Sequence, residues 1–226
     1  MLTKIGNANR DNPLRRPAEE LADRIANPKQ NLIPARAGGP EPERYALFLA
    51  KCRELAVTID EIASDDAAPA AIADYLKGLN LPGRLKLSPS PEVTDLPWDT
   101  APLLDVASGA AEISDQTGVT PAFAGIAETG TLVFVSGKET PPTLNFVPDN
   151  HIVVMRRSQV VRAMEDAFAA ARERFGAGVM PRTLNLVSGP SRTGDVEQKI
   201  VMGAHGPRRL HIVMIDDVDN AAKQGD

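Results

Sequence analysis

The chain is poor in cysteine and histidine. Cys52 is the single cysteine among 226 residues, so the chain cannot form an internal disulfide. It also cannot by itself hold an iron–sulfur cluster or a cysteine-rich zinc site. The three histidines are dispersed and show no His-x-x-x-His spacing, so we expect no metal bound by this chain. We therefore expect that any redox chemistry in which the protein takes part is not carried out by its own single thiol.

Aromatic residues and long apolar runs are also scarce. The chain has nine aromatic residues and no dense Lys/Arg cluster among them, which argues against a nucleic-acid surface built on base stacking. Its uninterrupted apolar stretches are only a few residues long, too short for a membrane span. The N-terminus lacks the apolar core of a secretory signal peptide. We therefore expect a cytoplasmic protein with no membrane span and no nucleic-acid partner.

Charge is unevenly distributed along the sequence. The net charge is −5, from 25 basic and 30 acidic residues. Residues 1–36 carry seven basic and four acidic groups, residues 37–150 carry seven and seventeen, and residues 151–226 carry eleven and nine. The middle of the chain is therefore acidic and its two ends are mildly basic.

Proline and glycine divide the chain into an arm and a body. Five prolines and two adjacent glycines punctuate residues 1–40, where only a short helix from about Ala18 to Ala26 fits between them. We interpret residues 1–40 as an N-terminal arm and residues 41–226 as an α/β domain. The pattern predicts one apolar helical stripe from Tyr45 to Ile62, with Cys52 on it as a core residue. It predicts a shorter helix over residues 69–79.

Buried strands and a further helix follow. Short apolar runs predict strands over residues 84–87, 131–135, 151–155, 183–187 and 210–215. Ser158 is suited to cap a helix that runs to Phe175. A strand, a helix and a strand with short connections predict a right-handed parallel crossover. We therefore expect an α/β fold with a mostly parallel sheet flanked by helices.

The first candidate loop is Gly125–Thr131, directly before a predicted strand. Its glycines allow a ligand to approach the backbone closely, and Glu128 is suited to acid/base or covalent chemistry. Thr129 and Gly130 are candidate ligand contacts. The alternative is a tight turn with a solvated glutamate.

The second candidate loop is Ser188–Glu197, directly after a predicted strand. Glycine, hydroxyl groups and one arginine after a strand suit a carboxylate or phosphate, because N–H groups and a guanidinium can converge on the anion. The candidate ligand contacts are Ser188, Gly189, Ser191, Arg192 and Thr193. In the alternative interpretation Arg192 pairs with Asp195 or Glu197 and only braces the loop.

Histidines provide the third candidate. His205 lies between glycines in the loop Gly203–Arg209 and is a candidate proton shuttle or ligand contact, although a lone histidine is more often structural. His211 alternates in phase with Val213 and Ile215, so we interpret it as a core histidine with satisfied hydrogen bonds.

Taken in order, three motifs resemble the LUD domain of the lactate utilization protein C family. They are Ala127–Leu132, Ser188–Glu197 and Gly203–Ile212, and the resemblance extends from about Glu41 to Asp216. The family often has aspartate where this chain has Glu128, and alanine where it has Gly194. The arm matches the family only loosely, around Leu32–Arg36.

The resemblance implies both a fold and a role. The fold would be similar to the NagB/RpiA/CoA-transferase-like group. The role would be that of a cluster-free subunit in a system that oxidises L-lactate to pyruvate, with iron–sulfur clusters in its partner subunits and a small carboxylate or other anion as ligand. The roles of Glu128 and His205 as catalytic residues rest on loop position and residue type.

Two other function classes remain open. The chain can be a self-sufficient CoA transferase, isomerase or cyclo-ligase that acts on a small anionic substrate, with Glu128 as nucleophile or base. It can also be a binding module without catalysis.

Overall fold

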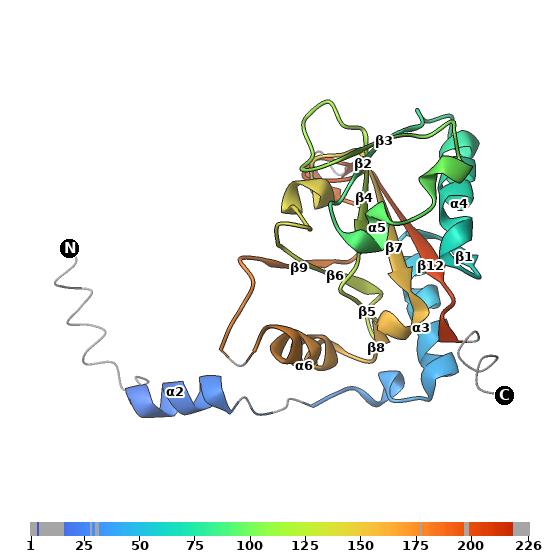
Figure 1. The fold of residues 1–226 in the computed structure, drawn as a ribbon. Helices are drawn as coiled ribbons and strands as arrows, with labels where there is room; N and C mark the ends of the chain where they lie inside the picture. The colour runs from blue at the N-terminus through green and yellow to red at the C-terminus, as the bar shows by residue number, and fades with distance from the viewer. Residues whose placement is uncertain are drawn as a thin grey trace.

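The fold centres on a six-stranded sheet in which every pair of neighbouring strands runs parallel (Figure 1). The computed structural model describes residues 4, 16–27, 29, 32–176, 178–196 and 199–218. The strands are β1 (Thr58–Ile62), β2 (Arg84–Leu87), β3 (Asp105–Ser108), β4 (Thr117–Pro121), β7 (Asn150–Arg156) and β12 (Arg209–Ile215). Their order across the sheet is β1-β12-β7-β4-β2-β3. The predicted α/β class with a mostly parallel sheet is confirmed.

A smaller sheet packs beside the main one. It has the order β8-β5-β6-β9, in which β6 runs antiparallel to both of its neighbours. Its strands are β5 (Ala124–Ile126), β6 (Thr131–Val135), β8 (Val160–Val161) and β9 (Leu184–Val187). A separate antiparallel hairpin joins β10 (Arg192–Val196) to β11 (Lys199–Met202).

Helices cover both faces of the main sheet. The helices with described bounds are α2 (Ala18–Ala26), α3 (Glu41–Glu54), α4 (Ala68–Gly78), the short α5 (Pro91–Thr94) and α6 (Met164–Phe175), of which α3 and α4 pack against opposite faces of the main sheet. Single 3-10 turns lie at Ala35–Ala37, Asp65–Ala67, Trp98–Thr100, Pro142–Asn145 and Arg157–Gln159. None of the helices in the described ranges is long and apolar enough to cross a membrane.

Successive residues of β7 and β12 face two separate cores. Val153 and Met155 pack with α3 and the smaller sheet, whereas Ile152 and Val154 pack with α4. Because side chains alternate along a strand and both faces are buried, each strand reads as a continuous apolar run. This is why residues 151–155 and 210–215 were identifiable as strands from the sequence.

The predicted helix over residues 45–62 is wrong in its last part. Helix α3 ends at Glu54, and Ala56 adopts a positive φ of 61° that breaks the helical path. Thr58–Ile62 forms β1, which pairs in parallel with β12. Ile59 and Ile62 fit the helical spacing by coincidence, and pairing with a distant strand decides their conformation.

The predicted crossover from residues 151–155 to residues 183–187 is also wrong. Strand β9 does not join the main sheet; it pairs antiparallel with β6 in the smaller one. Helix α6 begins at Met164 and not at Ser158, whose side chain and backbone N–H bond to Asp217. At the N-terminus of α6, just before Met164, the Ala163 N–H donates a hydrogen bond to the Asp166 side chain.

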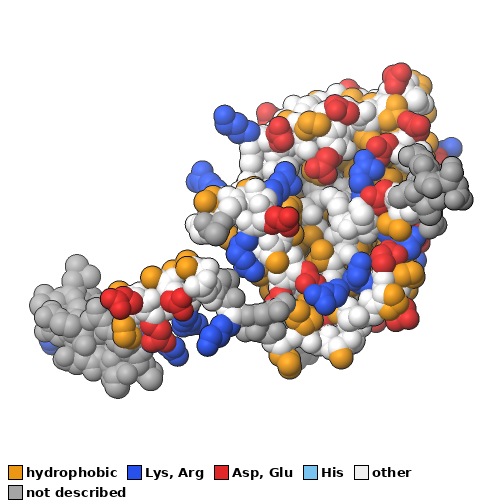
Figure 2. Space-filling view, turned by 60° about the horizontal axis from the view of Figure 1, so that its bottom comes forward, with side chains coloured by type: hydrophobic (Ala, Val, Ile, Leu, Met, Phe, Trp, Pro, Cys, Tyr) orange, Lys and Arg blue, Asp and Glu red, His pale blue; other side chains and the backbone are white. Residues whose placement is uncertain are grey.

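The short helix in the arm is confirmed over Ala18–Ala26. None of its residues is buried, and the helix stands apart from the body of the molecule (Figures 1 and 2). Its apolar side chains Leu21 and Ile25 are 45% and 72% exposed. This helix therefore adds nothing to the core.

Candidate functional site

The turn between β5 and β6 carries Glu128, Thr129 and Gly130. The Gly130 N–H donates to the Ile126 carbonyl at 2.9 Å, which closes the turn. Gly130 has a φ of +67°, and a Cβ there would lie 2.8 Å from the carbonyl carbon of Lys51 in α3. Only glycine allows this close approach of the turn to the end of α3. The Cys52 Sγ lies 3.7 Å from the Gly130 carbonyl oxygen at the same contact.

Three hydroxyl groups connect this turn to the second candidate loop. The Oγ1 atoms of Thr129 and Thr131 are 2.7 Å apart, and the Thr131 Oγ1 lies 2.8 Å from the Ser188 Oγ. Thr131 is buried, whereas Thr129 and Ser188 are exposed. The fold therefore brings together two loops that are almost sixty residues apart in sequence, through a hydrogen-bonded row of hydroxyls that reaches solvent at both ends.

The Glu128 carboxylate faces the N-terminal arm. Its Oε1 accepts a hydrogen bond from the Arg36 guanidinium at 2.8 Å. The Glu128 side chain is 13% exposed and the Arg36 side chain is 63% exposed. Arg36 was not among the candidates; the loose match around Leu32–Arg36 was the available signal for it. Within the described ranges the Glu128 carboxylate is bonded to Arg36 and not to Arg192, Ser188 or His205.

The second loop is held against the end of α3. Gly189 has a φ of +89°, and a Cβ there would lie 2.7 Å from the Leu55 carbonyl oxygen. The Arg192 guanidinium donates to that same oxygen. A cation at the carboxyl end of a helix bonds the free carbonyls and complements the helix dipole. Arg192 therefore fastens the loop to α3 with one of its five N–H donors.

The second loop is shorter than predicted, because Arg192 is the first residue of strand β10. Thr193 pairs with Val201 in the β10–β11 hairpin. The alternative pairing of Arg192 with Asp195 or Glu197 concerns side chains that lie outside the described part of the structure.

The third candidate loop packs against the second. The Ser191 Oγ accepts a hydrogen bond from the backbone N–H of His205 at 3.2 Å, and the Ser191 N–H donates to the Pro207 carbonyl at 2.8 Å. The His205 side chain itself is exposed. The sequence-predicted residues thus form two adjoining groups, one around the Thr131 hydroxyl and one around Ser191.

The other two histidines and the cysteine are core residues. His211 is 1% exposed, stacks on Tyr75 at 3.8 Å between ring centroids, and pairs through Nδ1 with the Thr58 Oγ1 at 2.9 Å. His151 is also 1% exposed, and its Nε2 lies 2.7 Å from the Thr120 Oγ1. Burial raises the pKa of the Cys52 thiol to about 12, which makes it a poor nucleophile. The expected core position is confirmed for His211 and Cys52, but the hydrogen bonds of His211 are not all satisfied, because its buried Nε2 has no hydrogen-bond partner among the described residues.

No group of three or more His, Cys, Asp or Glu side chains in the described ranges is arranged to hold a metal ion. The chemistry available in the site is that of a carboxylate beside a guanidinium, with hydroxyl and backbone N–H donors close by. Such groups bind small anions and transfer protons.

Comparisons with known proteins find one matching family model and several similar proteins. The family model of the LUD domain matches residues 111–215. Lactate utilization protein C of Geobacillus thermodenitrificans is 35% identical over 109 residues, which cover 47% of this chain and 45% of that protein. Lactate utilization protein C of Bacillus subtilis is 31% identical over 101 residues, or 44% and 42% of the two chains. The matches thus span less than half of these relatives.

One solved structure supports the fold. The crystal structure of a DUF162 family protein from Deinococcus radiodurans superposes with a TM-score of 0.55 at 24% identity. The similarity covers 78% of this chain and 99% of that one.

Proposed function

We propose that the chain is a cluster-free component of a lactate utilization system, because residues 111–215 match the family model of the LUD domain and similar proteins carry the name lactate utilization protein C. In this proposal the system oxidises L-lactate to pyruvate, and the iron–sulfur clusters that accept the electrons are held by partner subunits. The chain itself offers one buried cysteine, which does not fit a cluster.

One observation carries the proposal at the level of the site. The row of hydroxyls from Thr129 through Thr131 to Ser188 joins the two motifs that the family resemblance singled out. Hydroxyl donors next to the Gly189 backbone suit the carboxylate of a 2-hydroxy or 2-oxo acid. Arg192, anchored at Leu55, has further N–H donors for the same anion.

Glu128 would then act on the bound anion as a general base. Its carboxylate has a second oxygen besides the one that Arg36 contacts, and in this proposal that oxygen accepts the proton from the substrate. Arg36 would hold the carboxylate in position, as a positioning residue.

The role is tested by purification and growth. The tagged chain is purified from lactate-grown cells, and the eluate is examined by mass spectrometry and visible absorption. We expect a cysteine-rich partner and a broad band near roughly 400 nm, typical of thiolate-ligated clusters. A colourless protein without a partner would overturn the subunit role. Acyl-CoA and sugar-phosphate panels would then test the stand-alone enzyme.

The site is tested by substitution in the same cells. We expect Glu128→Gln and Ser188→Ala to slow growth on L-lactate at least about tenfold while the chain remains folded and abundant. Glu173→Gln is the matched control, because Glu173 is an exposed glutamate on α6 outside the site. If cells that carry Arg192→Ala grow on L-lactate at the wild-type rate, Arg192 does not bind the anion.

A further inference from the structure

A pocket lies at the end of the β5–β6 hairpin opposite the Glu128 turn. Its cavity volume is about 210 Å³, well above the roughly 10–15 Å³ that a single water needs. Ala122 and Phe123 before β5 and Val135 at the end of β6 line it, whereas Glu128 lies in the turn at the opposite end. The pocket is therefore separate from the site described above.

The pocket occupies a place where open α/β sheets bind ligands. Pro121, the last residue of β4, lines it, and so does Ser90, which follows the neighbouring strand β2. The carboxyl ends of two adjacent parallel strands thus open into the pocket. The last turn of α6 closes it from the side of the smaller sheet with Arg174 and Phe175.

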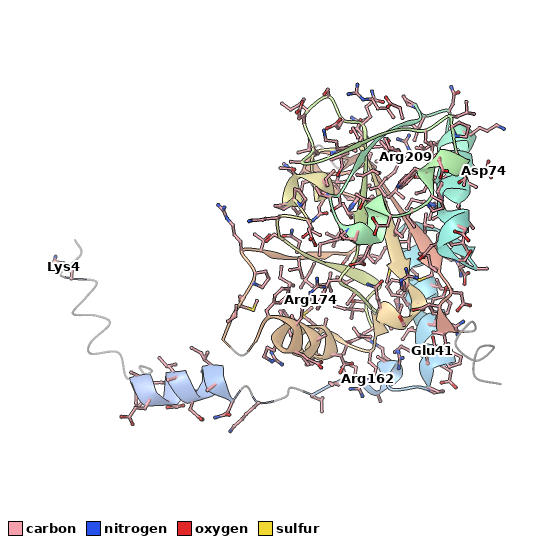
Figure 3. The ribbon with its side chains drawn as sticks, in the orientation of Figure 1. Lys4, Glu41, Asp74, Arg162, Arg174 and Arg209 are labelled. Atoms are coloured by element: carbon pink, nitrogen blue, oxygen red, sulfur yellow. The ribbon has the colours of Figure 1, made fainter. Side chains whose placement is uncertain are left out.

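Two cations face the pocket without an ion-pair partner among the described residues: Lys138 and Arg174. Arg174 lies on the side of α6 that faces β6 and β9 (Figure 3). Its guanidinium carbon is 5.6 Å from the ring centroid of Phe123 and 5.7 Å from that of Phe175. A guanidinium that rests on aromatic faces keeps its N–H donors for a carboxylate.

The aromatic and acidic side chains narrow the class of ligand. The rings of Phe123 and Phe175 lie 6.4 Å apart and offer an apolar surface to a planar body. Glu92 and Glu139 also line the pocket, and they repel a ligand with several negative charges. These side chains together favour one negative charge on a flat apolar group.

We propose that this pocket binds a small planar or aromatic monocarboxylate. Arg174 and Lys138 bind its carboxylate, and Phe123 and Phe175 contact its ring or planar face. The volume suits a single small molecule and not a dinucleotide.

Isothermal titration of the purified full-length chain with benzoate tests the proposal. We expect saturable binding at a single site. Arg174→Gln should weaken it roughly tenfold or more, because a charge-assisted hydrogen-bond pair is lost. Arg172→Gln is the matched control, an exposed arginine on the same helix that does not line the pocket. Benzyl alcohol, which has the ring without the charge, should bind more weakly, as should inorganic phosphate, which has charge without a ring.

Phe123→Leu separates the two parts of the proposal. It should weaken benzoate binding and leave the binding of phosphate unchanged. Absence of saturable benzoate binding, or equal loss in the Arg172→Gln and Arg174→Gln variants, would overturn the site. Phosphate binding as tight as benzoate would overturn the ligand class. The Glu128→Gln variant should bind benzoate as the wild type does. The benzoate titration therefore tests this pocket even where the proposed role in lactate utilization is overturned.

Discussion

At the scale of single residues, two buried histidines are held in the neutral form. Burial lowers the pKa of His151 to about 3. Burial also lowers the pKa of His211 to about 4, against the opposing effect of the Asp60 carboxylate, whose Oδ2 lies 3.5 Å from the His211 Nε2. Both side chains contact threonine hydroxyls, which can donate to a neutral imidazole nitrogen.

This predicts a loss of stability in mild acid. An unfolded histidine has a pKa of about 6.5, so below that pH the unfolded chain binds protons that the folded chain does not. The free energy of unfolding should therefore fall as pH falls from about 6.5 towards 4, by up to about 1.4 kcal/mol per pH unit for each histidine. Urea unfolding at a series of pH values measures this.

Two variants provide the controls for the acid prediction. His151→Gln should show a shallower dependence of unfolding free energy on pH. The exposed His205, changed to Gln, should leave the dependence as it is. An identical slope in the wild type and in His151→Gln would contradict the assignment.

At the scale of elements, the contact between α3 and the two candidate loops depends on glycine. Both Gly130 and Gly189 have positive φ angles, and both face backbone atoms of the last turn of α3 or the residue after it. The hydroxyl row from Thr129 to Ser188 is set by this contact, because each glycine flanks one end of it.

Gly130→Ala should therefore destabilise the protein by at least about 2 kcal/mol. Its new Cβ would need to displace backbone atoms of Lys51 and Cys52 at 2.8 and 2.9 Å, in addition to the strain of a positive φ. Gly178→Ala is the matched control, with a φ of +76° and no atom within 4 Å of the added Cβ. It should cost only the backbone strain, about 1 kcal/mol. Equal unfolding free energies in urea for the two variants would refute the close contact.

At the scale of the whole molecule, Arg157 connects elements from distant parts of the sequence. Its guanidinium binds both carboxylate oxygens of Glu41 at 2.9 Å and reaches Asp216 at 3.1 Å. The same group lies 4.5 Å above the ring centroid of Tyr45. The start of α3, the end of β7 and the segment after β12 are thereby joined at the carboxyl edge of the main sheet.

Figure 2 shows cationic and anionic side chains interspersed on the face turned to the viewer.

Arg157→Met should lower the free energy of unfolding by about 2 kcal/mol. The Arg157 side chain is 13% exposed, so the substitution removes a largely buried guanidinium that binds both Glu41 and Asp216. Arg162→Met is the matched control, because Arg162 is 43% exposed and pairs with Asp166 on the solvent side. We expect a much smaller effect there. A large loss in thermal or urea unfolding for Arg162→Met, with little for Arg157→Met, would reverse this ranking.

The sequence by itself determined several helices and strands whose local residue pattern is enough to identify them. Strands β2 and β6, with most of β7 and β12, could be predicted because each is a short apolar run, and the helix at Ala18–Ala26 because it is the stretch left free between prolines. The motif at Glu128–Thr131 and the motif from Ser188 could likewise be recognised, together with the family that they resemble.

Only the tertiary structure decided how those pieces combine. Thr58–Ile62 is a strand because β12 lies beside it, and Leu184–Val187 joins the smaller sheet because β6 does. Arg36 meets Glu128, and Thr131 meets Ser188, across separations that carry no local signal. Sequence periodicity reports which face of an element is buried, but not which partner buries it. The choice of partner is a long-range packing property and is settled only when the chain folds.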